Sequence, residues 1–215
     1  MASALTQFPT ATPFVPDKHT LTALRDAMPR CEGCDLYRHA TQVVPGAGTS
    51  RARLMLVGEQ PGDQEDLAGK PFVGPAGMML RKVIEEIQVD PKTVFVTNAV
   101  KHFKFVLRGK RRLHESPRMS EINACRPWLL AELDAVKPQV VVCLGASAAK
   151  SLLGGSFALM TSRGKVLESA YAQRVVATVH PSAILRARDE TSRHGLYQIL
   201  KDDLALAYAT SLKNS

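Results

Sequence analysis

Short apolar runs alternate with helical patterns along this chain, and that alternation limits its fold more than any other feature. Four runs have the length and composition of buried strands: residues 53–57, 93–97, 140–144 and 174–179. Helices are predicted around them, at residues 18–28, 79–87, 120–136 and 146–153. Strands that alternate with helices favour a mainly parallel sheet covered on both faces. The expected fold class is therefore α/β, a single three-layer α/β/α domain with a mainly parallel central sheet of about four strands.

The length of the chain sets the expected number of domains. Its 215 residues are enough for one domain with a substantial core and too few for two ordinary domains. The first 17 residues include Pro9, Pro13 and Pro16, which is typical of a loose segment. We expect residues 1–17 to form a flexible arm and residues 18–215 to form the single domain.

The charge balance points to a polyanionic partner. Lys and Arg number 28 against 20 Asp and Glu, which gives a formal net charge of +8. No run approaches the roughly 18 apolar residues of a membrane span, and the first residues lack the basic-then-apolar order of a secretory signal. We expect a cytoplasmic protein with no membrane partner. In that reducing compartment, metal or redox chemistry explains the close pair Cys31 and Cys34 better than a disulfide does.

Polar residues and glycines follow the predicted strands, and ligands of such sheets bind beyond the carboxyl ends of the strands. The segments concerned are residues 58–62 (GEQPG), Asn98, Gly145 and residues 180–182 (HPS). Gly58 and Gly62 lack the spacing of a dinucleotide fingerprint, and the chain contains no phosphate-binding P-loop motif, so no nucleotide cofactor is expected. On its own, the acidic cluster behind the first strand is more typical of a solvated turn that caps a helix.

Several of these segments together resemble a known family, the family 4 uracil-DNA glycosylases. The motifs match in order and spacing: residues 58–62, 71–77 (PFVGPAG), 97–101 (TNAVK) and 180–182. The likeness runs from about Cys31 to the last helix. More closely, residues 101–105 (KHFKF) and the insertion 109–114 (GKRRLH) look like the glycosylase X type (UdgX), known for covalent attachment to uracil-containing DNA. Leu113 stands where that type usually has isoleucine, a change of shape at similar volume that should be tolerated.

The resemblance implies a pocket for a uracil base turned out of the DNA stack. Phe72 would stack on the base, and His180 would face O2, where negative charge gathers as the base leaves. The Asn98 amide offers a donor and an acceptor that match the uracil edge and mismatch cytosine. Gln60 and Asp63 are assigned to the same uracil site, and Gln60 and His180 also to the catalytic group. Taken alone, Phe72 is better explained as a core aromatic. For His180 a turn residue is the alternative.

His114 is the expected nucleophile. A neutral imidazole near the sugar can attack the cationic anomeric carbon once uracil has left, while Glu59 stabilises that cation or orients the imidazole. Turnover would then stop with the protein attached to DNA. A simpler interpretation of this basic segment is a loop that grips phosphate, and both interpretations can hold together. DNA contacts are expected from Lys101, Lys104, Lys110, Arg111, Arg112, Ser182 and Arg186.

Four residues are the expected ligands of a 4Fe-4S cluster. Cys31 and Cys34 form a close-spaced chelating pair, and Cys125 lies on the helix after the basic segment. The resemblance places His102 where family 4 proteins carry a cysteine ligand. Cys143 is the alternative fourth ligand, although a buried strand suits a free cysteine better. Zinc is the alternative to iron, since three cysteines and a histidine are also a zinc set. The cluster's role should be structural, because uracil excision consumes no electrons.

Three functions are compatible with the sequence, and the first is the expected one, with the other two as alternatives. The first is a glycosylase that cleaves the base–sugar bond of uracil in DNA and stays bound through His114 to the anomeric carbon of the abasic deoxyribose. The second is a conventional multiple-turnover family 4-like uracil-DNA glycosylase, and the third is a non-catalytic DNA-binding module. In each case the expected partner is DNA, and the chain is expected to be a monomer.

Overall fold

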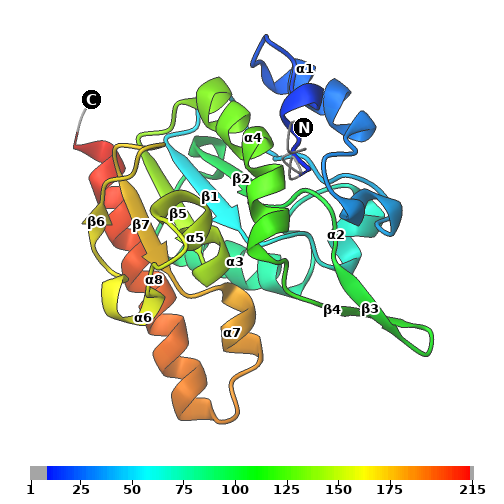
Figure 1. Ribbon diagram of the computed structural model, residues 1–215. Coiled ribbons are helices and arrows are strands. Elements are labelled where there is room, and N and C mark those ends of the chain that lie inside the picture. The colour runs from blue at the N-terminus through cyan, green and yellow to red at the C-terminus, as the bar shows by residue number, and fades with distance from the viewer. Residues whose placement is uncertain (1–8, 214–215) are drawn as a thin grey trace.

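A five-stranded sheet forms the centre of the protein, for which the computed structural model describes residues 9–213. The strands are β1 (Leu54–Gly58), β2 (Val94–Asn98), β5 (Val140–Leu144), β6 (Val166–Leu167) and β7 (Val175–Thr178). Their order across the sheet is β2-β1-β5-β7-β6, and only β6 runs antiparallel to its neighbour (Figure 1). The predicted three-layer α/β/α class is confirmed. The fifth strand was not predicted, because two residues are too few to show a sequence period.

Helices cover both faces of the sheet. One face packs against α3 (Pro75–Glu86), α7 (Pro181–Leu185) and α8 (Glu190–Leu212), and the other against α4 (Met119–Val136) and α5 (Ala146–Leu153) (Figure 1). Both β1 and β5 are buried along their whole length, which explains their uninterrupted apolar sequences. A further short α-helix, α6 (Leu159–Ser162), lies near the β6 edge.

The longest described helix, α8, has 23 residues. Neither it nor any other helix within residues 9–213 is both long and apolar enough to cross a membrane.

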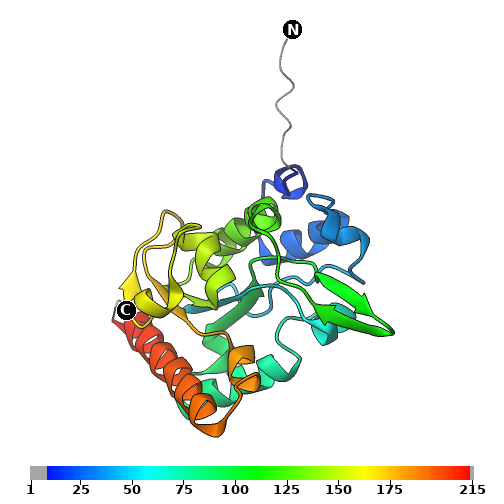
Figure 2. The same ribbon diagram turned by 60° about the horizontal axis from the view of Figure 1, so that its bottom comes forward.

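The segment after β2 forms a β-hairpin where the sequence suggested a loop. Strands β3 (Phe105–Arg108) and β4 (Arg111–His114) pair antiparallel around Gly109, which has a φ of 60°. The hairpin projects beyond the sheet next to α2 (Asp63–Ala68) (Figures 1 and 2). Its run of basic residues masks the alternation that would have predicted strands. His114 consequently stands at the end of a strand, which gives it a defined place.

The N-terminal part forms a small layer beside α4. It contains α1 (Leu21–Ala27) and the short 3-10 helices η1 (Thr12–Phe14), η2 (Met28–Arg30) and η3 (Asp35–Arg38), while η4 (Pro91–Thr93) precedes β2. The expected flexible arm needs correction here, because Ala11 is buried and its N–H donates to the carbonyl of Ala124 at 2.8 Å. Residues 1–8 of that arm lie outside the described residues.

Candidate active site

A cavity of about 630 Å³ opens at the carboxyl ends of β1, β2 and β5. Nine residues proposed from the sequence for catalysis, uracil binding or DNA binding line it: Glu59, Gln60, Asp63, Phe72, Asn98, His114, His180, Ser182 and Arg186. They come from the ends of β2 and β4, from the start of α2, from α7 and from the loops next to these elements. Segments that lie more than a hundred residues apart in the sequence therefore meet in one place, as the position of a site in such a sheet requires.

Phe72 and Asn98 form an inner wall of this cavity. Phe72 is 7% exposed, and its ring centroid lies 6.4 Å from that of His180. Asn98 is 3% exposed, and its side-chain amide has no hydrogen-bond partner among the described residues. Because Asn98 lines the cavity, its amide is free to hydrogen-bond a ligand there. The pair thus offers an aromatic face beside an unused amide NH2 group and an unused amide oxygen.

The absence of a side chain at Gly58, the last residue of β1, allows Phe72 and Asn98 to pack closely together. A Cβ atom at this position would overlap the side-chain oxygen of Asn98 and the ring of Phe72. Phe72 itself has a positive φ of 55°, which is uncommon for a residue with a side chain, and Arg81 donates to its carbonyl oxygen at 2.9 Å. The wall therefore depends on close backbone approach rather than on the two functional side chains alone.

His180 is held as a neutral imidazole with a defined tautomer. Burial, assisted by the electrostatic influence of Arg186 and of the nearby His114 ring, lowers its pKa to about 4. The backbone N–H of Ser182 donates to Nδ1 at 3.2 Å, and the Ser182 hydroxyl lies 2.7 Å from the same nitrogen. Since Nδ1 accepts, the single proton of the neutral ring sits on Nε2. His180 can therefore donate a hydrogen bond from Nε2 at neutral pH.

Glu59 joins the strand-end loop to the hairpin. Its Oε1 lies 3.3 Å from Nε2 of His114, and its Oε2 accepts a hydrogen bond from the hydroxyl of Ser147. The side chain of His114 is 44% exposed, whereas that of Glu59 is 21% exposed. A carboxylate this close to an imidazole can orient the ring and take up its proton. The sequence indicated Glu59 and His114 but not Ser147, which follows the predicted strand 140–144 by only three residues.

Gln60 has a different role from the one its motif suggested. Its side-chain nitrogen donates to the carbonyl oxygens of Lys104 and Glu115, both at 3.0 Å, and its oxygen accepts from the backbone N–H of Lys104 at 3.1 Å. Both side-chain N–H groups are thus committed to the two ends of the hairpin segment. We correct the expected catalytic and uracil-binding role of this amide, which instead fastens the hairpin to the loop after β1.

Two lysines expected to bind DNA are turned inward, and their assignment is corrected. Lys101 is fully buried, and its ammonium donates to Glu132 at 2.6 Å, to the Thr97 hydroxyl at 2.6 Å and to the Asn98 carbonyl at 2.8 Å. The Lys104 side chain is 9% exposed and pairs with Glu121 at 3.1 Å. Neither ammonium group is available to a phosphate in this arrangement, because each already has internal acceptors.

Arg112 also binds within the protein. Its guanidinium reaches Asp63 and Asp66 on α2, each at 2.6 Å, and lies over the rings of Phe103 and Phe105 at 5.5 and 5.1 Å. Asp63 therefore serves as a partner for the hairpin as well as lining the cavity. This contact corrects the expected role of Arg112 as a phosphate ligand. Of the DNA contacts expected on the hairpin, Lys110 and Arg111 are exposed to solvent.

Three of the four expected metal ligands are neighbours in one buried cluster. Cys31, Cys34 and Cys125 pack together between the N-terminal layer and α4. Trp128 donates to the Cys31 sulfur at 3.1 Å, and the backbone N–H of Lys101 donates to the Cys125 sulfur at 3.3 Å. Burial raises the pKa of Cys34, and it raises that of Cys125 to about 12. The donor types and the N–H groups aimed at sulfur fit a thiolate-bound cluster.

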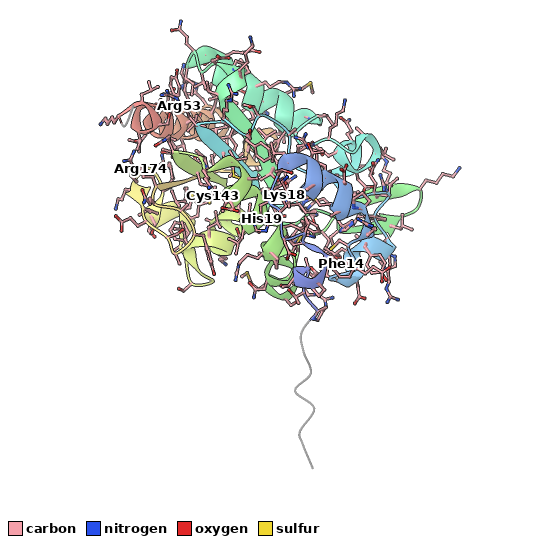
Figure 3. All side chains as sticks on the ribbon, turned by 90° about the horizontal axis from the view of Figure 1, so that it is seen from above. Phe14, Lys18, His19, Arg53, Cys143 and Arg174 are labelled. Atoms are coloured by element: carbon pink, nitrogen blue, oxygen red, sulfur yellow. The ribbon has the colours of Figure 1, made fainter. Side chains whose placement is uncertain are left out.

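The expected ligands are not drawn together into a finished site. Within residues 9–213, no three His, Cys, Asp or Glu side chains are placed so that they could hold a metal ion. His102 is buried next to Lys101, and burial lowers its pKa to about 4. Cys143 lies in a separate part of the core, on the α4 and α5 face of β5, well away from Phe14 of the N-terminal layer in Figure 3. Its position gives no support to its role as the alternative ligand.

Comparisons with known proteins agree with this geometry. The family model of the uracil DNA glycosylase superfamily matches residues 45–203, a range that includes every cavity residue named above. The chain is 34% identical over 165 residues to the Type-4 uracil-DNA glycosylase of Thermotoga maritima, covering 76% of this chain and 82% of that protein. It is 36% identical over 162 residues to the Type-4 enzyme of Archaeoglobus fulgidus, covering 72% and 78%. The chain belongs to the uracil DNA glycosylase superfamily.

Proposed function

We propose that this protein is a uracil-DNA glycosylase that remains covalently attached to its DNA product through His114. Membership of the superfamily and the names of the Type-4 relatives support the glycosylase part. The observation that carries the covalent part is the position of His114, whose imidazole lines the cavity and lies 3.3 Å from Glu59. A nucleophile beside an orienting carboxylate is the usual arrangement for covalent catalysis.

Base recognition follows from the inner wall of the cavity. A uracil turned out of the DNA can stack on Phe72 and pair its O4 and N3–H with the free amide of Asn98. Its O2 then faces the Nε2–H of His180. As the bond between N1 of uracil and C1′ of the sugar breaks, the electron pair leaves with the base. The hydrogen bond from His180 strengthens as this negative charge develops, which lowers the barrier.

The sugar left behind is an oxocarbenium cation, and two residues of the cavity act on it. The carboxylate of Glu59 stabilises the positive charge. One nitrogen of the neutral His114 ring then bonds to C1′, and the other nitrogen gives up its proton to Glu59 or to water. The product is a neutral N-alkyl imidazole, which is a poor leaving group. Release is therefore slow, and each molecule acts once.

The rim of the cavity suits a DNA strand. Arg186 and Ser182 lie beside the cavity at the two ends of α7, and Leu185, which also lines it, is 44% exposed. An exposed apolar side chain at such a place can fill the gap left by a flipped base. Lys110 and Arg111 extend the positive surface along the hairpin turn, where they can contact phosphates without reading sequence.

The proposal is tested by replacing His114 with Ser and following a uracil-containing single-stranded oligonucleotide on a denaturing gel. Wild type should give a heat-stable, shifted band. His114→Ser should lose that band and continue to release uracil with turnover, because Phe72, Asn98, His180 and Glu59 remain. Uracil release by wild type without a shifted band would favour the conventional multiple-turnover enzyme. An adduct that persists in His114→Ser would mean that another residue is the nucleophile.

We extend the proposal to a structural 4Fe-4S cluster held by Cys31, Cys34, Cys125 and His102. The shared burial of the three cysteines and the N–H groups directed at two of the sulfurs support this choice. Such a cluster would supply a covalent tie between the N-terminal layer, α4 and the segment that leads into the hairpin. None of the chemical steps above passes through it.

Purified protein provides the test of the cluster. It should contain iron and absorb at about 400 nm, the usual region of thiolate-to-iron transitions. His102→Ala should lower both the iron content and the absorbance, whereas Cys143→Ala, in the other part of the core, should lower neither. Bound zinc without absorbance would replace iron in the assignment, and loss of the band in Cys143→Ala alone would move the fourth ligand.

A further inference from the structure

Ser147 makes a contact in the cavity that the proposed mechanism does not yet use. It lies in the first turn of α5, three residues after β5 ends, and its hydroxyl donates to Oε2 of Glu59. We propose that Ser147 is a positioning residue that fixes the Glu59 carboxylate for both uracil release and capture by His114. This inference rests on the proposed function, because it assigns Ser147 a role through Glu59.

The contacts of Glu59 show why an anchor is needed. Among the described residues its carboxylate has two partners, His114 at Oε1 and Ser147 at Oε2. His114 sits at the end of a projecting hairpin and is 44% exposed, so it is the less restrained of the two. Ser147 is part of a helix packed on the sheet. A glutamate side chain held at one oxygen loses its rotamer freedom and presents the other oxygen in a fixed direction.

The ordinary alternative for a serine at this place is a helix cap. The N-cap of α5 is Gly145, and no side chain there satisfies the first N–H groups of the helix. The hydroxyl of Ser147 is directed at Glu59 instead, across 88 residues of sequence. Ser151, one turn further on, shows the contrasting case, because its hydroxyl bonds to the Ala148 carbonyl within the same helix at 2.6 Å. Ser147 thus directs its donor to the site, and Ser151 to the helix.

The expected consequence is a loss of reaction rate without a loss of folding. Ser147→Ala leaves Glu59 free to rotate away from the sugar and from His114. Both the rate of uracil release and the rate of adduct formation should fall roughly tenfold. This loss is smaller than the loss expected on removing a group that transfers the proton itself. Ser147→Thr keeps the hydroxyl and should stay within about threefold of wild type, a smaller loss than that from removing the donor. The melting temperature of both variants should match that of wild type.

The experiment is single-turnover kinetics on a uracil-containing oligonucleotide, with uracil release and adduct formation measured separately. Ser151→Ala is the matched control and should leave both rates unchanged. In a Glu59→Gln background, Ser147→Ala should add little, because residues that act through one group are not additive. Wild-type rates in Ser147→Ala, full additivity with Glu59→Gln, or failure of Ser147→Thr to restore the rate would each overturn the inference.

The readouts separate this inference from the proposed function. If wild type releases uracil and forms no adduct, covalent capture is wrong, while the rate of uracil release still decides the role of Ser147. If wild type releases no uracil, both proposals are wrong. If wild type does both and the serine variants behave like wild type, the proposed function stands and the positioning role of Ser147 does not.

Discussion

The inner wall of the cavity and the β3–β4 hairpin contribute to one site in contrasting ways. Phe72 and Asn98 are almost completely buried and stand against the ends of parallel strands, so the fold itself places them. His114 is exposed and stands on a two-stranded element outside the sheet. Among the described residues, polar contacts of Gln60 and Arg112 connect that element to the loop after β1 and to α2.

Under the proposed mechanism, this contrast makes uracil excision and covalent capture separable. A change in the wall should slow cleavage of the base–sugar bond, and adduct formation should slow with it because capture follows cleavage. A change in the hairpin or its fastenings alters what happens to the sugar after the base has gone. Substitutions at the wall, at the connection and at the hairpin tip should therefore give three different kinetic patterns, with effects that decrease in that order.

The largest effect is expected at the wall, from Gly58→Ala. The added methyl group meets Asn98 and Phe72, which must shift apart, and a displacement of about 1 Å in such a site can cost roughly a hundredfold in rate. Uracil release and adduct formation should both fall by at least about that factor. Gly155→Ala is the control, since nothing lies within 4 Å of a Cβ there. A near-normal rate of uracil release by Gly58→Ala would show that Phe72 and Asn98 can accommodate the methyl group without loss of activity, against this prediction.

An intermediate effect is expected at the connection, from Gln60→Leu. The change removes three hydrogen bonds and takes their Gln60 partner from the Lys104 N–H and the Glu115 carbonyl. An unpaired buried group of this kind costs about 1–3 kcal/mol. The hairpin should loosen, so adduct formation should fall roughly tenfold while uracil release changes less than about threefold, as measured in the same single-turnover reaction. Gln64→Leu, at an exposed position of the cavity, serves as the control. Equal losses in both rates would instead return Gln60 to the catalytic group.

The smallest effect is expected at the hairpin tip, from Arg111→Gln. This exposed cation should contribute one phosphate contact, so DNA affinity should weaken modestly and the slope of log affinity against log salt should become smaller by about 1. Binding titrations at several salt concentrations measure both quantities. Arg112→Gln is the informative comparison. Its partners are Asp63 and Asp66, so it should slow adduct formation and leave the salt slope nearly unchanged.

The sheet and most of the cavity are predictable from the sequence because both follow local rules. Apolar runs locate four of the strands, and the rule that ligands bind at strand ends is enough to indicate Glu59, Asn98 and His180. Ser147 carries a weaker signal, a hydroxyl just after a strand end. Because a serine at the start of a helix is usually a cap, its place in the sequence does not indicate a role in the site.

The pairing of charges is not predictable in this way. The basic sequence context predicts DNA contacts for Lys101, Lys104 and Arg112. In the folded protein these side chains instead pair with carboxylates, which a count of basic residues does not reveal. The same limit affects Gln60, whose partners are backbone groups of a hairpin 44 and 55 residues away. Whether a polar side chain faces solvent or the interior depends on contacts between distant segments, and no local pattern encodes them.

The buried pair of Lys101 and Glu132 has a consequence for how this chain can vary. Among the described residues, each charge is compensated by the other and by nearby polar groups, and both side chains are at most 2% exposed. Removing either partner alone leaves an uncompensated charge in the core and destabilises the fold by about 3–5 kcal/mol. Replacing both by apolar residues of similar volume is often neutral for stability. Intermediate sequences with one of the two charges would be selected against. The two positions should therefore change together or stay fixed, so that in evolution they behave as a single site spread over 31 residues of sequence.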